Sequence, residues 1–159
     1  MNKIKYPLAV LAVDDNEDLL ELIGQELEYR FEKIYRVSDV NMAKAILHNN
    51  KIDVVVSDFQ MPEQSGADLL KWIRIDKRMS TPFILLTGNA TDKKALEVFK
   101  YNAFNIIDKP YISEVLINSI FHAFIFQHYL KISGLENTEI HTTEKILNQI
   151  LSIQLKKVS

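Results

Sequence analysis

Short apolar runs alternate with amphipathic stretches along most of this 159-residue chain. Runs rich in valine and isoleucine, flanked by Asp, Asn, Gly or Pro, are typical of buried strands in a parallel sheet. The runs are Leu8–Val13, a weaker one at Ile34–Val37, Ile52–Val56, Phe83–Leu86 and a brief one at Ile106–Ile107. The pattern therefore predicts five strands.

Apolar residues at helical spacing fill the segments between these runs. The first helix is expected after Asn16 and the fourth after Thr91, since both residues are good N-caps. The fifth is expected from Ser113 to about Ile132. Alternating strands and helices with short connections imply right-handed crossovers and helices on both faces of the sheet. The predicted fold is α/β: a doubly wound, five-stranded parallel sheet over residues 1–132, with a C-terminal helical extension at residues 133–159.

Composition narrows the classes of function. The formal net charge is -2 and no stretch holds more than three consecutive basic residues, so nucleic-acid binding is not expected. The absence of cysteine excludes a disulfide scaffold, a zinc-thiolate site and thiol catalysis. No apolar stretch approaches the ~20 residues that a membrane span needs. We therefore expect a cytoplasmic protein that binds neither nucleic acid nor membrane.

Polar residues stand where the predicted strands end. Asp14 and Asp15 close the first strand, Asp58 the third, Thr87 and Gly88 the fourth, and Lys109 and Pro110 the fifth. Taken singly, such an Asp is often a helix N-cap and such a Lys is often a solvated loop charge. Because the carboxyl ends of parallel strands share one edge of the sheet, however, we expect these residues to converge on a binding site.

The charges of this site indicate its chemistry. Three carboxylates within a few ångströms repel one another, and one would be driven towards protonation unless a cation shared the site. Mg²⁺ prefers carboxylate, carbonyl and water oxygens and would resolve the repulsion. Together with Lys109 and the hydroxyl of Thr87, it would make a pocket for a phosphoryl group. Asp58 is the expected nucleophile because it stands centrally, with Asp14 and Asp15 as metal holders.

These strand ends resemble the receiver domain of two-component response regulators. The resemblance covers about residues 7–130 and is carried by Val13-Asp14-Asp15-Asn16, the segment Val56 to Pro62, Gly66, Leu86-Thr87-Gly88 and Asp108-Lys109-Pro110. It implies a flavodoxin-like fold that is phosphorylated on Asp58. It also implies Mg²⁺ as cofactor, with Asp14, Asp15, Asp58 and the backbone carbonyl of Gln60 as its ligands. Thr87 would turn towards the phosphoryl oxygens, Lys109 would pair with them, and Pro110 would follow a cis peptide bond.

The resemblance also implies partners. The expected donor is a sensor histidine kinase or a phosphotransfer protein of a phosphorelay. A homodimer would form through the surface of the fourth helix, fifth strand and fifth helix, or through the C-terminal helix. The domain would catalyse only its own phosphorylation and dephosphorylation, so it is not expected to be a free-standing enzyme.

Three positions depart from the family pattern or vary within it. The aromatic switch residue normally lies three residues before the lysine, and here that residue is Ile106, which has no ring to turn. Either Phe104 or Tyr111 would substitute, or the switch would be read through the loop after Thr87. Gln60 and Asn89 occupy the positions thought to tune access of water to the phosphoryl group.

Two other functions stay open. Ile106 is the main support for a receiver-like interaction module that signals without phosphorylation. An Asp-nucleophile phosphatase is the third possibility. It would need an acid two residues after Asp58, and Gln60 cannot protonate a leaving group.

The fifth helix and the tail form the least family-like region. Apolar residues from Val115 to Ile132 point all round the helix, which predicts burial on every side. A further helix with a wide apolar face is expected from about Thr142 to Val158. It would pack on its own domain, bind a partner or second copy, or act as a linker. We expect removal of residues 134–159 to expose Phe121, Phe124 or Phe126.

Overall fold

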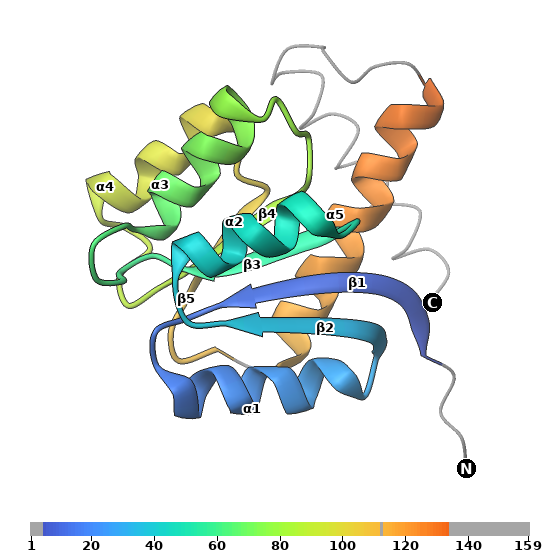
Figure 1. Cartoon of the computed structure of the whole chain (residues 1–159), viewed down its shortest axis with the longest axis horizontal. Helices are drawn as coiled ribbons and strands as arrows, with labels where there is room; N and C mark the ends of the chain where they lie inside the picture. The colour runs from blue at the N-terminus through green and yellow to red at the C-terminus, as the bar shows by residue number, and fades with distance from the viewer. Residues whose placement is uncertain (1–4, 112, 134–159) are drawn as a thin grey trace. The chain divides into compact units, whose positions relative to one another are not determined.

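A computed structural model describes residues 5–111 and 113–133 of the chain (Figure 1). The chain divides into two compact units, residues 1–124 and residues 125–159. The sheet and the whole candidate site belong to the first unit. Most of the predicted C-terminal extension, including its helix, lies outside the described residues.

The sheet has the predicted five parallel strands. They are β1 (Tyr6–Val13), β2 (Phe31–Val37), β3 (Val54–Asp58), β4 (Phe83–Thr87) and β5 (Asn105–Asp108). Their spatial order is β2-β1-β3-β4-β5, which confirms the doubly wound α/β fold. The order reverses between β1 and β3, and ligands of such sheets bind at the carboxyl ends of the strands beside this point.

Among the described residues there are seven helical segments, of which six connect the strands and α5 follows β5. They are α1 (Glu17–Glu28), α2 (Val40–Asn49), α3 (Gly66–Lys71) continued by the π-helix η1 (Trp72–Asp76), α4 (Lys93–Leu96) continued by the 3-10 helix η2 (Glu97–Tyr101), and α5 (Ser113–Ser133). Asn16 caps α1 as predicted, with its side chain accepting from the Leu19 N–H at 3.1 Å. The predicted Thr91 cap is wrong. Asp92 caps α4, because Thr91 is engaged in a local turn with Asn89.

Alternate side chains of the strands point to opposite faces of the sheet and form two apolar layers. On one face Leu11, Val55 and Leu85 pack with α2, α3 and α4, in a set that we call the first core cluster. On the other face Val10 and Val56 pack with α1 and α5, forming the second core cluster. Figure 1 shows α1 on the opposite side of the sheet from α3 and α4. Both faces of the sheet are therefore covered, as its apolar strands require.

The first part of α5 buries one stripe rather than its whole circumference. Leu116, Ile120 and Ala123 are buried in the second core cluster at helical spacing. Val115 remains 48% exposed in this single chain. Cover of the remaining faces of α5 by the tail or by a second copy of the chain stays a prediction. Within the described part of the chain, no helix has the length and apolarity needed to cross a membrane.

Candidate functional site

β1 and β3 bring two carboxylates to the reversal point of the sheet. Val13 pairs with Ser57, so β1 and β3 end side by side. Asp14 and Asp58 are both buried there, 2% and 7% exposed, whereas Asp15 is exposed. One carboxylate oxygen from each aspartate lies within 4.8 Å of the other two. The structure therefore brings the three predicted carboxylates together.

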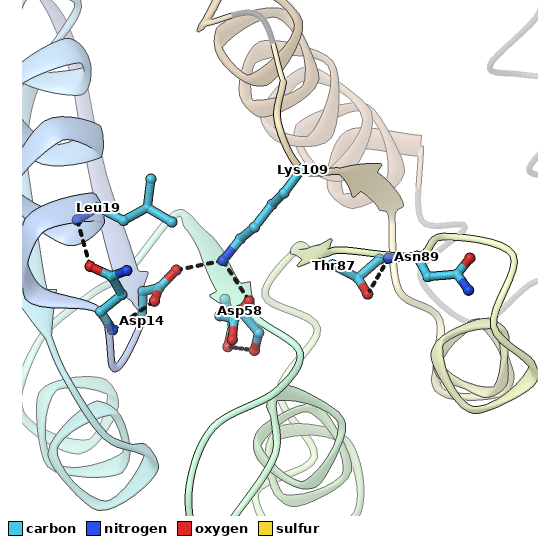
Figure 2. Close-up of polar contacts among 8 residues, drawn as sticks. Asp14, Leu19, Asp58, Thr87, Asn89 and Lys109 are labelled. Atoms are coloured by element: carbon cyan, nitrogen blue, oxygen red, sulfur yellow. Dashed lines mark hydrogen bonds and ion pairs between the residues drawn. The ribbon is translucent and has the colours of Figure 1, made fainter.

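Lys109 supplies the positive charge of this pocket. Its Nζ lies 2.8 Å from Asp14 Oδ2 and 2.6 Å from Asp58 Oδ1 (Figure 2). Its backbone N–H donates to Thr87 O at 2.7 Å. This bond extends the pairing of β4 and β5 by one residue beyond the end of β5. The Lys109–Pro110 peptide bond is cis, as the resemblance implies. One ammonium group is thus shared between two buried carboxylates.

Sharing one cation leaves the carboxylates incompletely neutralised. Burial raises the pKa of Asp58 above its ordinary value; Lys109 opposes this, while the charges of Asp14 and Asp15 add to the rise. Burial by itself would lower the pKa of Lys109, but its hydrogen bonds to Asp14 and Asp58 outweigh that effect, and the pKa is raised. The two shifts agree, because a single lysine gains from two partners while each aspartate receives only part of its charge.

The donor set fits a hard divalent cation. Three carboxylates and one ammonium group leave the pocket with excess negative charge. Oxygen ligands and negative charge are what Mg²⁺ and similar ions require. Gln60, two residues after Asp58, has an exposed side chain. The role of its carbonyl as a further ligand stays a prediction.

The backbone beneath Asp58 is held by a close approach of two segments. The Gly66 N–H donates to Phe59 O at 3.0 Å, and the Ser57 hydroxyl donates to Asp58 O at 2.9 Å. A Cβ on Gly66 would collide with the Asp58 carbonyl oxygen and press on Leu85. Only glycine fits here without moving the strand that carries Asp58.

Thr87 lies at the neighbouring strand end but is bonded elsewhere. It is buried, and its Oγ1 accepts from the Asn89 N–H at 3.2 Å (Figure 2). Asn89 itself is exposed, as is Gly88. The structure thus places the predicted site residues of β4 beside the pocket, with the Thr87 hydroxyl directed into its own loop.

The two aromatic substitutes for Ile106 lie on the wrong face of the sheet. Ile106 packs against the first core cluster, whereas Phe104 and Tyr111 pack against the second. By strand alternation, Thr87 shares the face of Leu85 and Ile106. No ring from Phe104 or Tyr111 therefore occupies the place of the missing switch residue.

Sequence reasoning assigned no role to two residues beside the site. Ser57 holds the Asp58 carbonyl, and Asp108 accepts from the Ala90 N–H at 2.5 Å. Both stood within the motifs that carried the resemblance. Asp108 closes a strand directly before Lys109, and that position was the available signal.

The family follows from comparison of the whole domain. Residues 10–121 match the family described as response regulator receiver domain. The chain belongs to the response regulator receiver family. This receiver domain is 31% identical over 144 residues to the two-component response regulator ARR10 of Arabidopsis thaliana, covering 87% of this chain and 24% of that protein. Against the response regulator SaeR of Staphylococcus aureus it is 29% identical over 108 residues, covering 68% of this chain and 46% of SaeR.

Solved structures show the same receiver fold. A receiver domain from Clostridium thermocellum is 30% identical with a TM-score of 0.68, covering 77% of this chain and 98% of that one. The chemotaxis response regulator CheY4 of Vibrio cholerae is 25% identical with a TM-score of 0.67, covering 74% and 99%. The chain spans less than half the length of the two curated relatives. As a response regulator receiver domain it is a module of two-component signalling, a family whose members typically act as signalling switches.

Proposed function

We propose that this receiver domain is a phosphorylation-dependent switch that accepts a phosphoryl group on Asp58. The donor is the phosphohistidine of a sensor histidine kinase or a phosphotransfer protein. The observation that carries the proposal is the position of Lys109 Nζ, within hydrogen-bond distance of both Asp14 and Asp58 at the carboxyl edge of the sheet. A phosphate-binding cation, a central carboxylate and acidic neighbours are the parts that phosphoryl transfer to aspartate needs.

In the transfer step a carboxylate oxygen of Asp58 attacks phosphorus in line with the bond to the donor nitrogen. That P–N bond breaks, and its electron pair stays on the imidazole. Lys109 leaves the Asp58 carboxylate and pairs with the phosphoryl oxygens, and Thr87 turns to donate its hydroxyl to them. When bound at Asp14, Asp15, Asp58 and the Gln60 carbonyl, Mg²⁺ would neutralise the carboxylates and the charge of the transferred group.

Residues around the pocket are proposed to tune this state. Gln60 and Asn89 are both exposed, so their side chains can meet water that enters towards the phosphoryl group, although Asn89 Oδ1 already accepts from the N–H and hydroxyl of Thr91. Gly88 leaves open space in the loop beside Thr87. Pro110 fixes the turn after Lys109. Hydrolysis of the phosphoryl group is then the only turnover of the domain.

One alternative has an observation in its favour. Ile106 lacks a ring, and Phe104 and Tyr111 lie on the other face of the sheet. A module that binds partners without phosphorylation would need no switch residue at this position. A phosphatase is less well supported, since Gln60 stands where the acid is needed. Phosphorylation of Asp58 separates these possibilities.

Intact mass after incubation with acetyl phosphate and millimolar Mg²⁺ is the direct test. The wild type should gain one phosphoryl group, and Asp58→Asn should gain none. Asp76→Asn, at the exposed end of η1, is the matched control and should be labelled like the wild type. An unchanged wild-type mass would rule out the phospho-acceptor role. A labelled Asp58→Asn protein would move the acceptor to Asp14 or Asp15.

The region after the receiver domain is proposed to be a separate extension. The family match ends at residue 121, and the related receiver structure that is covered over 98% of its length matches 77% of this chain. Residues 133–159 are therefore proposed to serve packing, dimerisation or linkage rather than phosphorylation. A homodimer through α4, β5 and α5 is the other proposed association. Because the donor is itself phosphorylated from ATP, we place the domain in the cytoplasm.

A further inference from the structure

The loop between β4 and α4, residues 88–92, is fixed by few contacts. The Asn89 N–H donates to Thr87 Oγ1 at 3.2 Å, and Asn89 Oδ1 accepts from the N–H and hydroxyl of Thr91 at 3.1 and 2.8 Å. Gly88 is exposed, and a Cβ placed on it would meet no atom within 4 Å. Side-chain packing therefore does not hold the start of the loop; hydrogen bonds do.

One side chain from another strand reaches this loop. Asp108 Oδ1 accepts from the Ala90 N–H at 2.5 Å, across 18 positions of sequence. Asp108 is the last residue of β5 and pairs in register with Thr87, the last residue of β4. Of the side-chain hydrogen bonds among the described residues, this is the one that ties residues 88–92 to a strand other than β4.

Asp108 lies on the face of β5 that carries Ile106. Side chains alternate along a strand, and Ile106 packs with the cluster that includes α4. Ile106 has no ring that could move together with Thr87. Asp108, on the same face of β5, is instead hydrogen-bonded to the loop that follows Thr87. The coupling between this strand and the loop is consequently carried by a carboxylate.

We propose that Asp108 is a positioning residue that holds the loop in its unphosphorylated conformation and sets how readily Thr87 turns towards Asp58. This inference rests on the proposed phosphorylation of Asp58. For Thr87 to reach a phosphoryl group there, its hydroxyl must leave the Asn89 N–H and the start of the loop must shift (Figure 2). The bond between Ala90 and Asp108 opposes that shift, since a hydrogen bond to a carboxylate is about twice as strong as a neutral one.

The rate of phosphorylation by acetyl phosphate with Mg²⁺ tests the proposal. Asp108→Ala removes the acceptor and should speed phosphorylation of Asp58 about fivefold, as expected for one exposed hydrogen bond. Asp108→Asn keeps an acceptor oxygen without the charge and should lie between this variant and the wild type. Asp92→Ala is the matched control. It removes a carboxylate and its 2.8 Å hydrogen bond to the Lys94 N–H from the same loop, but no tie to β5.

Hydrogen exchange at the Ala90 amide reports the tie without any phosphodonor. This amide should be protected in the wild type and in Asp92→Ala, and should exchange faster in Asp108→Ala. Unchanged exchange or an unchanged phosphorylation rate in Asp108→Ala would overturn the inference. So would equal acceleration in Asp108→Asn, which would assign the effect to charge alone, or equal acceleration in Asp92→Ala. A wild type that takes up no phosphoryl group at all would instead remove the proposed function, while the exchange result would still show whether the tie exists.

Discussion

The two sides of the phosphoryl pocket are held in different ways. On the β1–β3 side, Asp14 and Asp58 are buried, and Asp58 sits on a strand that Gly66 approaches closely from behind. On the β4–β5 side, Thr87 is buried but leads into an exposed loop around Gly88, where a side chain would meet open space. The first side is fixed by packing and the second by individual hydrogen bonds.

The helical segment after that loop, α4 continued by η2, is held at its C-terminal end by Arg74. Arg74 on η1 donates to the carbonyl oxygens of Met79, Tyr101 and Asn102, and its burial lowers its pKa to about 10. The end of η2 is therefore held by two hydrogen bonds from one buried guanidinium group, whereas, among the described residues, a single side-chain hydrogen bond, from Ala90 to Asp108, ties the β4–α4 loop to another strand. We call the β1–β3 side, with Asp14 and Asp58, the binding side, and the β4–β5 side, with Thr87 and its loop, the responding side. The comparison shows that the binding side is already held in place before phosphorylation. The responding side is a short segment that can change its conformation.

Loss of Lys109, which reaches Asp14 and Asp58 from the end of β5, should impair phosphorylation most severely. Lys109→Ala removes the cation that pairs with Asp14 and Asp58 and, in our proposal, with the phosphoryl oxygens. We expect phosphorylation of Asp58 to slow by about 100-fold, the cost of losing one preorganised electrostatic contact. Quench-flow or intact-mass kinetics with acetyl phosphate measures this. Lys100→Ala, at an exposed position of η2, should leave the rate unchanged; equal loss in both variants would mean that the pocket is assigned wrongly.

Substitution of one glycine on each side tests the difference in packing directly. Gly66→Ala forces a Cβ against the Asp58 carbonyl oxygen, so the free energy of unfolding should fall by about 1–3 kcal/mol. Gly88→Ala adds a Cβ where nothing lies within 4 Å, so its stability should stay within about 0.5 kcal/mol of the wild type. Urea denaturation gives both values. Similar losses for the two substitutions would contradict the contrast between a packed and an open side.

Metal affinity sharpens the roles of the charges. Asp15→Ala removes one of the three clustered carboxylates and should weaken Mg²⁺ binding by about tenfold. Lys109→Ala removes a positive charge from the same pocket and should leave binding intact or slightly tighter. Calorimetric titration with Mg²⁺ gives both dissociation constants. A parallel weakening in the two variants would show that Lys109 organises the acidic cluster rather than opposing the ion.

The smallest expected effect is on stability against pH without Mg²⁺. The pKa of Asp58 is raised in the folded protein, mainly by burial, so the folded state binds its proton more tightly than the unfolded state. The free energy of unfolding therefore falls as pH rises from ~3.9, the pKa of an aspartate in the unfolded chain, through the higher pKa of Asp58 in the folded protein. Above the folded pKa the loss of stability is complete. Asp58→Asn removes this penalty and should raise the free energy of unfolding at pH 7.

Denaturation of Asp58→Asn and wild type at pH 7 and near pH 4 checks the sign. The advantage of the variant should shrink at the lower pH, because the wild-type carboxyl takes up its proton more readily in the folded than in the unfolded state. Asp76→Asn provides the charge-matched comparison at an exposed position. An advantage that grows on acidification would show that the ion pair with Lys109, rather than burial, governs this group.

The sequence by itself determined the fold and most of the binding side. The period of the apolar runs gave five strands and their order along the chain, and the strand ends supplied Asp14, Asp15, Asp58 and Lys109. These features depend on local patterning and on the rule that parallel strands end at one edge, so no contact had to be known in advance.

The tertiary structure alone decided how the responding side is held. The tie between Ala90 and Asp108 joins residues 18 positions apart and depends on how β4 and β5 pair, which no local pattern specifies. The contact of Gly66 with Asp58 and the cap at Asp92 instead of Thr91 are likewise set by the path of a loop. Periodicity records which face of an element is buried, whereas a single hydrogen bond in a loop depends on where two distant backbones meet.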